Sequence, residues 1–446
     1  MTGKLVTRCR ACGSKSLSPA FSLGQDRDYV FCDPDKDVTA CGLLQQAVIS
    51  DRESAAHAEG VSRSHRHRLR AAVSEAMEMV TTRDGLALDI GCGDGTLTSF
   101  YPRWIEAVSV DKVDPGKGAH DWAKVVQGVF PEKATLERIR DHAGKRKFDI
   151  ITAISVLGEQ TAPGAFLTAL RDQLADDGIA IIETTYASLA LMRNHVDAFH
   201  HDAETIFTLT NLEAEARKAG LKIVRGAMTE TNGGSIRLFL THEDYAGHDY
   251  VPWLEQLARL WDEESVLNLA SRATFQVFIQ RVERNRAEMA DILDNMERFN
   301  LHAHVIGADP AMRALLETYG ISGSHVSFVI GRETGEVKTP RNMPVGDGFI
   351  EIVAEEDVRL AQPDYLFACS SQRREVLEHW RDAIFNGVKV VFLTPEVEII
   401  DDKNYGTELG KALAVTDGPG SVETLKAVLS TVRRPRLVAV NTALEA

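Results

Sequence analysis

The sequence predicts an α/β protein built on a doubly wound parallel sheet, with smaller units on either side of it. Three observations support this prediction. A buried apolar strand at 86–89 runs directly into a glycine-rich turn. A second apolar strand, 107–110, ends in the acidic residue Asp111. Further strands, up to residue 183, alternate with helical segments, as in a parallel sheet covered by helices. Ligands of such sheets bind beyond the carboxyl ends of the strands, so a site is expected there.

The glycine-rich turn is the most specific motif in the chain. Its glycines let the backbone turn sharply after Asp89, and the Asp111 carboxylate can accept both hydroxyls of a ribose. The spacing Asp-x-Gly-x-Gly-x-Gly resembles the first motif of class I S-adenosylmethionine methyltransferases. An ordinary strand-to-helix turn is the alternative. The expected cofactor-binding residues, which include the end of the fourth strand, are Asp89, Gly91, Gly93, Gly95, Asp111 and Ile154.

Composition and charge narrow the classes of partner. The chain has 446 residues, is 44% hydrophobic and carries a formal net charge of −15. Such an acidic chain is not expected to bind nucleic acid or an anionic membrane, because either would require a basic face. No apolar run approaches the length of a membrane span, and the first twenty residues hold no apolar signal core. We therefore expect a cytoplasmic protein with a small-molecule substrate.

Four cysteines near the start of the chain predict a structural metal site. Cys9 and Cys12 have zinc-knuckle spacing, and Cys32 and Cys41 follow in a segment poor in hydrophobic residues. Four thiolates of this kind typically hold zinc. The alternative is a set of reduced cysteines in a small flap. The other two cysteines, Cys92 and Cys369, are expected to be packing residues.

Candidate catalytic residues follow the fifth strand, where His200, His201, Asp202 and Glu204 lie within five positions. A histidine beside carboxylates can act as a general base near neutral pH. The alternative is a polar loop that covers the site, which would have the same sequence pattern. If these histidines take no part, His65 and His67 are the next candidates.

A second polar cluster precedes the apolar strand at 238–240. Its expected substrate contacts are Asn232, Ser235 and Arg237. The glycine pair inside this cluster permits close approach of the backbone to a ligand, but a hairpin turn would also use it.

The order of these motifs resembles the nucleotide-sugar C-methyltransferase family. The resemblance spans nearly the whole chain and includes the cysteine-rich start, the Asp89 motif, the histidine-rich segment, the Gly-Gly-Ser-Ile-Arg sequence at 233–237 and a second α/β region. It implies four parts: a zinc-binding domain at 1–50, a methyltransferase domain at 51–245, a helical connector at 246–300 and a Rossmann-like domain at 301–446. It also implies S-adenosylmethionine and structural zinc as cofactors.

The chain departs from the family at the expected catalytic positions. The family sequence Tyr-His-Glu-His aligns with His200, His201, Asp202 and Ala203, so the second histidine is replaced by alanine. The tyrosines that the family carries before the core are also missing. The resemblance still implies a C-methyltransferase of a nucleotide-linked keto sugar or a related carbonyl-activated metabolite. An O- or N-methyltransferase, or a non-catalytic nucleotide-binding protein, is the alternative.

Overall fold

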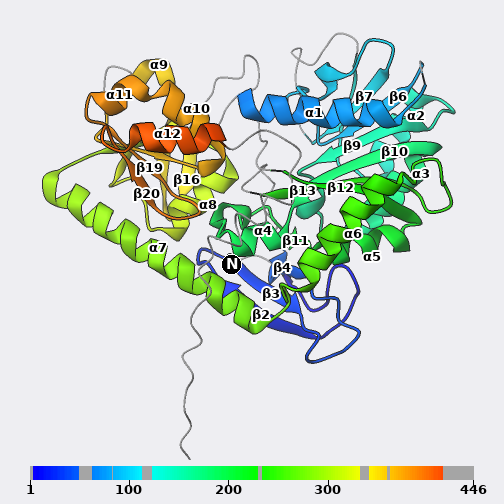
Figure 1. Cartoon of the computed structure of the whole chain (residues 1–446), viewed down its shortest axis with the longest axis horizontal. Helices are drawn as coiled ribbons and strands as arrows, with labels where there is room; N and C mark the ends of the chain where they lie inside the picture. Colours follow the sequence, from blue (N-terminus) through cyan, green and yellow to red (C-terminus); the bar gives the residue numbers. More distant parts are fainter. Residues whose placement is uncertain are drawn as a thin grey trace, which may run out of the picture.

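A computed structural model describes residues 4–49, 63–82, 84–112, 123–229, 234–331, 341–358 and 362–414. It contains two α/β units that lie side by side, with the amino-terminal strands beneath them (Figure 1). Within these ranges, no helix is both long and apolar enough to cross a membrane.

The amino-terminal part is a small antiparallel sheet with strand order β11-β4-β3-β2, plus a separate pair formed by β1 and β5. Strand β11 comes from the first α/β unit and pairs with β4 through Thr205–Gln45 and Ile206–Leu44, so the two parts share one sheet. The strands are β1 (Lys4–Leu5), β2 (Leu17–Ser22), β3 (Asp28–Cys32), β4 (Leu44–Gln46), β5 (Val48–Ile49) and β11 (Thr205–Ile206).

The first α/β unit has a seven-stranded sheet of order β12-β13-β10-β9-β6-β7-β8, in which β10, β9, β6, β7 and β8 are parallel and β13 is antiparallel to both of its neighbours. Every residue of β6 is buried, which explains its apolar sequence. The chain adds β7 and β8 on one side of β6 and then β9 and β10 on the other, so the strand order reverses between β6 and β9. The strands are β6 (Leu86–Ile90), β7 (Glu106–Asp111), β8 (Lys124–Gln127), β9 (Phe148–Ile154), β10 (Leu174–Thr185), β12 (Leu221–Thr229) and β13 (Ser235–His242).

Helices cover both faces of this sheet. Helix α1 packs on one face through Leu69 and Val73, while α2, α3, α5 and α6 pack on the other. This arrangement confirms the doubly wound class I fold that the sequence predicts. The helices are α1 (Arg63–Met79), α2 (Lys133–Ala143), α3 (Pro163–Gln173), α4 (Ala187–Met192), α5 (Leu209–Lys218) and α6 (Val251–Ser265), with the short turns η1 (Thr98–Phe100), η3 (Leu157–Glu159) and η4 (Val196–Ala198).

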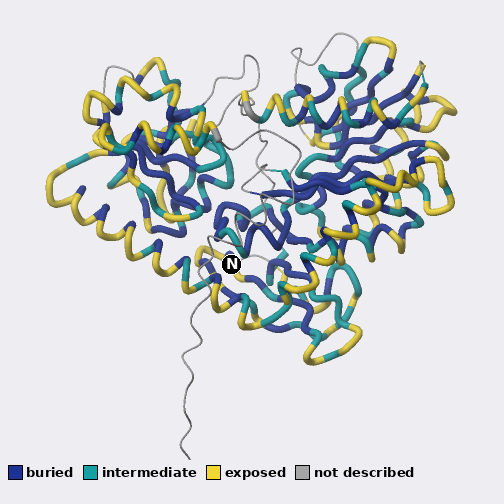
Figure 2. The backbone as a smooth tube through the Cα atoms, viewed as in Figure 1, coloured by how far each residue is buried: buried dark blue, intermediate teal, exposed yellow. Residues whose placement is uncertain are grey.

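Helix α7 (Arg272–Phe299) runs from the amino-terminal strands to the second α/β unit, with one face buried and the other exposed (Figures 1 and 2). The second unit has strand order β16-β17-β15-β14-β18-β19-β20. Its strands are β14 (Ala303–Ile306), β15 (Val326–Gly331), β16 (Asn342–Val345), β17 (Gly348–Ala354), β18 (Tyr365–Ala368), β19 (Lys389–Phe392) and β20 (Glu398–Ile400). Its helices are α8 (Pro310–Thr318), α9 (Glu355–Val358), α10 (Arg373–His379), α11 (Arg381–Phe385) and α12 (Tyr405–Ala414), with the turn η6 (Ser370–Gln372).

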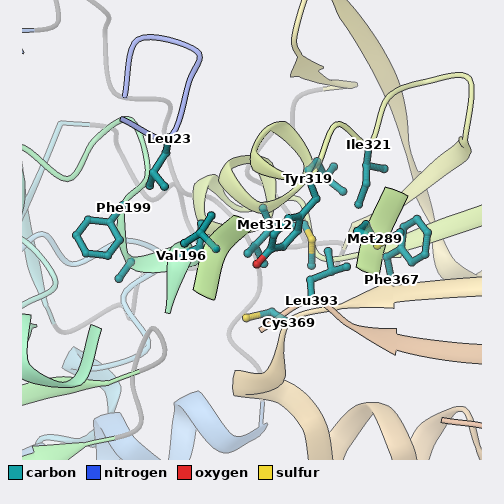
Figure 3. Close-up of a cluster of buried hydrophobic side chains, with 14 of the residues drawn as sticks. Leu23, Val196, Phe199, Met289, Met312, Tyr319, Ile321, Phe367, Cys369 and Leu393 are labelled. Atoms are coloured by element: carbon teal, nitrogen blue, oxygen red, sulfur yellow. The ribbon is translucent and has the colours of Figure 1, made fainter. Parts of the chain in front are cut away.

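One apolar core joins the three parts. It runs from Phe21 and Tyr29 of the amino-terminal sheet through Val196 and Phe199 to residues of α7, α8 and the second sheet. Figure 3 shows a part of this cluster, in which Val196, Met312, Cys369 and Leu393 lie together. The domain boundaries expected from the sequence stay predictions, and residues 51–62 and 415–446 lie outside the described part of the chain.

Candidate functional site

The glycine-rich turn after β6, residues 91–95, is here called the glycine loop. It lies at the carboxyl ends of β6 and β7, next to the point where the strand order reverses. Gly91 has φ 75°, and a Cβ atom there would lie 2.3 Å from Cγ2 of Val156. Gly93 has φ 54° and would meet nothing within 4 Å. Its backbone N–H donates a 2.9 Å hydrogen bond to Oδ2 of Asp111. The loop therefore needs glycine for its conformation, and at Gly91 for space as well.

Asp89 and Asp111 lie at the ends of neighbouring strands but have different surroundings. Asp89 is buried, and its carboxylate accepts hydrogen bonds from the hydroxyls of Thr98 (2.9 Å) and Thr152 (2.8 Å). Burial raises the pKa of Asp89 to about 6, although these two hydrogen bonds oppose the shift. Asp111 is partly exposed. Asp89 thus holds the loop in place, whereas Asp111 is accessible to a ligand.

The end of β9 completes this edge of the sheet. Ile154 is its last residue, and it is followed by Ser155, whose φ of 61° is unusual for a residue other than glycine. The N–H of Ser155 donates to the carbonyl oxygen of Glu183 in β10 (2.8 Å), so β9 and β10 are tied together where the cofactor is expected.

His65 lies in helix α1, which packs on one face of the same sheet. The negative charges of Glu183 and Asp94 lie close enough to raise its pKa, but burial and the charge of Arg68 outweigh them and lower it to about 4. The imidazole is therefore neutral at pH 7. On sequence alone His65 ranks behind His200 and His201 as a base, because its helix has the pattern of a solvated charged surface.

Arg237 forms ion pairs within the protein. Its guanidinium donates to Oε2 of Glu183 (2.6 Å), to Oε2 of Glu75 (3.0 Å) and to the carbonyl oxygen of Arg68 (3.1 Å). These contacts tie β13, β10 and α1 together. Ser235 is buried at the start of β13, and Asn232 lies outside the described residues. The structure thus gives Arg237 a structural role, and the substrate contacts expected of these three residues stay predictions.

The histidine-rich segment lies beyond the carboxyl end of β10, but its side chains point to different partners. Nε2 of His201 is 2.7 Å from Oε2 of Glu317 in α8, and this carboxylate also pairs with Arg313. Burial alone would raise the pKa of Glu317, but the hydrogen bond and charge of His201, together with Arg313, lower it below its ordinary value.

The rest of this segment contacts the amino-terminal sheet. The Glu204 carboxylate pairs with the guanidinium of Arg10, whose Nη1 also donates to the Glu204 carbonyl oxygen (2.6 Å). Nε2 of Gln46 donates to the carbonyl oxygens of His200 (3.1 Å) and His201 (2.9 Å). The segment therefore connects the three parts of the chain, and the catalytic roles expected of His200, His201, Asp202 and Glu204 stay predictions.

The four amino-terminal cysteines come together as the sequence predicts. Their sulfur atoms all lie within 4.8 Å of one another, and the Cys9–Cys41 and Cys12–Cys32 pairs are 3.5 Å apart. Four thiolates around one zinc ion, at about 2.3 Å each, lie roughly 3.8 Å apart, so this set fits a tetrahedral metal site. Nδ2 of Asn211 donates to the Cys41 carbonyl oxygen (2.7 Å) and ties the cluster to helix α5.

Comparisons with known proteins agree with this architecture. Residues 62–225 match a family model for a methyltransferase domain, and residues 230–395 match one for the C-methyltransferase C-terminal domain. The C-methyltransferase NovU of Streptomyces niveus is 25% identical over 228 residues, which are 51% of this chain and 52% of that protein. The chain thus spans about half the length of this curated relative.

Solved methyltransferase structures resemble one part of the chain. The 1,6-didemethyltoxoflavin-N1-methyltransferase of Burkholderia thailandensis is 18% identical, with a TM-score of 0.31, over 40% of this chain and 78% of that one. An S-adenosylmethionine-dependent methyltransferase of Clostridium acetobutylicum is 14% identical, with a TM-score of 0.31, over 39% of this chain and 90% of that one. The two family models, which match residues 62–225 and 230–395, together with the likeness to NovU, identify the chain as a divergent member of the C-methyltransferase family.

Proposed function

We propose that this protein transfers a methyl group from S-adenosylmethionine to a carbon atom of a small carbonyl-containing substrate, such as a nucleotide-linked keto sugar. The observation that carries the proposal is the match of residues 230–395 to the C-methyltransferase C-terminal domain, next to an intact glycine loop. The acidic charge of the chain, −15, is consistent with a small-molecule substrate. A cytoplasmic location stays a prediction from the sequence.

The residues that would hold the cofactor are those of the glycine loop, with Asp111 and Ile154. Asp111 is partly exposed at the end of β7 and would accept the ribose hydroxyls. The positive φ values of Gly91 and Gly93 support this assignment, because side chains at these positions would strain or fill the loop. When bound, S-adenosylmethionine supplies an electrophilic methyl group and leaves as a neutral thioether.

The chain must remove a proton from the carbon next to the carbonyl group. The electron pair of that C–H bond passes to the carbonyl oxygen, and on re-forming the carbonyl group it would bond the carbon atom to the methyl group that the bound cofactor supplies. We propose His65 as the proton acceptor, because its imidazole is neutral at pH 7 and the nearby charges of Glu183 and Asp94 would stabilise its protonated form. His201 is the other candidate, but Glu317 already occupies its Nε2 atom.

Proton exchange tests these assignments directly. The wild type, incubated with a panel of nucleotide-linked keto sugars in deuterated water without cofactor, should exchange the α-proton of its substrate. His65→Asn should lower exchange and turnover roughly a hundredfold and leave cofactor affinity unchanged, since a base acts in the transition state. His67→Asn, on the exposed face of the same helix, is the matched control.

The outcomes separate the alternatives. If His65→Asn keeps wild-type exchange while His201→Gln loses it, the base is His201. The replacement of the family's second histidine by the buried Ala203 favours two alternative functions. The first is methylation of an oxygen or nitrogen atom, and the second is ligand binding without methyl transfer. Methyl transfer without any α-proton exchange would support the first of these possibilities. Cofactor binding without any transfer would support the second.

We also propose that Cys9, Cys12, Cys32 and Cys41 hold one structural zinc ion. The fit of the four sulfur atoms to a tetrahedron supports this proposal. The site would fix the loops that carry the four cysteines against helix α5.

A further inference from the structure

The carboxyl edge of the second sheet is the place where a Rossmann-like domain ordinarily takes a ligand. Strands β14, β18 and β19 are parallel neighbours, and the strand order reverses between β14 and β18, because β15 and β17 are added on one side of β14 and β18 and β19 on the other. Gly307, with φ 98°, follows β14, and Asp309 caps helix α8 with a hydrogen bond from the N–H of Met312 (2.7 Å). This is the geometry of a ligand edge.

In this protein a segment of the first α/β unit lies against that edge. We call residues 194–199, which follow helix α4, the docking segment. Nδ2 of Asn194 donates to the carbonyl oxygen of Pro395 just after β19 (2.9 Å). The thiol of Cys369, just after β18, donates to Oδ2 of Asp197 (3.4 Å).

Apolar packing accompanies these hydrogen bonds. Val196 and Phe199 are fully buried in the same cluster as Met312 of α8 and Leu393 at the end of β19. Figure 3 shows Val196 beside Met312, with Cys369 and Leu393 close by. The docking segment is therefore part of the core that joins the two units.

The carboxylate of Asp197 makes this contact specific. Its side chain is 1% exposed, and Nδ1 of His195 lies 3.3 Å from its Oδ1 atom. Burial raises the pKa of Cys369, so the thiol keeps its proton and acts as the donor. The thiol sulfur in turn accepts a hydrogen bond from the hydroxyl of Ser371 (3.3 Å). A buried carboxylate that lost these partners would be strongly disfavoured, so the segment has one preferred position.

The docking segment leads directly into the histidine-rich turn. His201 contacts Glu317 of α8 only two positions after Phe199, and the carbonyl oxygens of His200 and His201 are held by Gln46. The second unit thus holds the segment that follows β10, and it shares the turn after it with the amino-terminal sheet.

We propose that the second α/β unit acts as a receptor for this docking segment, with Asn194, Asp197 and Cys369 as positioning residues that align the carboxyl edge of β10 for methyl transfer. The docking segment then lies at the edge where a Rossmann-like domain ordinarily takes a ligand. The catalytic consequence rests on the proposed methyl transfer, whereas the docking does not, so the two are measured separately.

Hydrogen exchange measures the docking in the full-length protein. Cys369→Ala removes the thiol donor, and exchange at the amides of residues 195–199 should rise at least tenfold. Cys369→Ser restores a donor of similar size and should bring exchange back to within about threefold of the wild type. Unchanged exchange in Cys369→Ala would overturn the docking contact.

A second variant guards against misfolding. Asn194 has φ 57°, so Asn194→Gly keeps the backbone conformation and removes only the side chain. Asn268→Gly, at an exposed asparagine with φ 45°, is the matched control. Asn194→Gly should raise exchange in the docking segment, and Asn268→Gly should not.

Turnover then tests the positioning role. In both docking variants kcat should fall roughly tenfold, with the affinity for S-adenosylmethionine unchanged and kcat restored in Cys369→Ser. Faster exchange with unchanged kcat would refute the positioning role. If the wild type transfers no methyl group to any substrate, the proposed function fails, and the exchange data alone still decide whether the segment docks.

Discussion

A substitution at Gly91 tests the glycine loop, because the resulting loss in the free energy of unfolding follows from the geometry of this position. Gly91→Ala places a Cβ atom at φ 75°, where a non-glycine residue costs about 1 to 2 kcal/mol. The same Cβ atom would lie 2.3 Å from Cγ2 of Val156, and overpacking of this kind typically costs about 1 to 3 kcal/mol more. The expected loss in the free energy of unfolding is therefore roughly 2 to 5 kcal/mol.

Two further variants separate strain from crowding. Gly93→Ala has a positive φ but open space around it, so it should cost only the conformational part, about 1 to 2 kcal/mol. Val156→Ala removes the clashing methyl groups, so the double variant Gly91→Ala/Val156→Ala should lose less stability than the two single changes added together. Urea denaturation measures all four proteins. Equal costs at Gly91 and Gly93, with additive behaviour of the double variant, would refute the assigned contact.

Three further predictions concern the cofactor, the metal and the titration of the site. Asp111→Ala should weaken the binding of S-adenosylmethionine by about 1.5 to 3 kcal/mol in calorimetry, because the ribose loses a charged hydrogen-bond acceptor. Unchanged affinity would remove Asp111 from the site. Elemental analysis should find about one zinc per chain, lost when Cys12 and Cys41 are both replaced by Ser, and zinc retained in that variant would contradict the assignment. Because the pKa of His65 falls from 6.5 to about 4 on folding, its own contribution to stability should rise with pH between these values by up to about 3 kcal/mol, whereas Asp89, whose pKa folding raises from 3.8 to about 6, contributes a fall over much of the same range. His65→Gln should flatten that rise when unfolding is measured from pH 4.5 to 7.5, and an unchanged slope would show that His65 is not buried as a neutral group.

The parts of the fold that the sequence predicts are those with local signals. Strands β6, β7, β9 and β10 lie where apolar runs predict them, and the glycine spacing places the loop correctly. The four cysteines could also be predicted as one cluster, because a Cys-x-x-Cys pair followed by two more cysteines is typical of a zinc site.

The partners of the candidate catalytic residues could not be predicted, because they are set by contacts between distant parts of the chain. His201 meets Glu317, which is 116 positions away, and Glu204 meets Arg10, which is 194 positions away. A run of histidines and carboxylates looks the same in sequence whether it serves catalysis or joins domains. Only the tertiary structure shows that these side chains point away from one another.

The junction between the three parts contains buried charges, and these determine how the segment after β10 is held. The guanidinium of Arg27, in the amino-terminal part, is fully buried, lies 3.8 Å from Oε2 of Glu317 and donates to the hydroxyl of Thr318 (2.8 Å). Burial lowers the pKa of Arg27, whereas the charge of Glu317 raises it. Desolvation offsets most of the attraction in such pairs, so they add little net stability, but a wrong partner leaves a charge unpaired. An apolar junction would tolerate small rotations between domains. A junction of Arg27, Glu317 and His201 does not, and it therefore holds the segment after β10 in one place relative to the glycine loop.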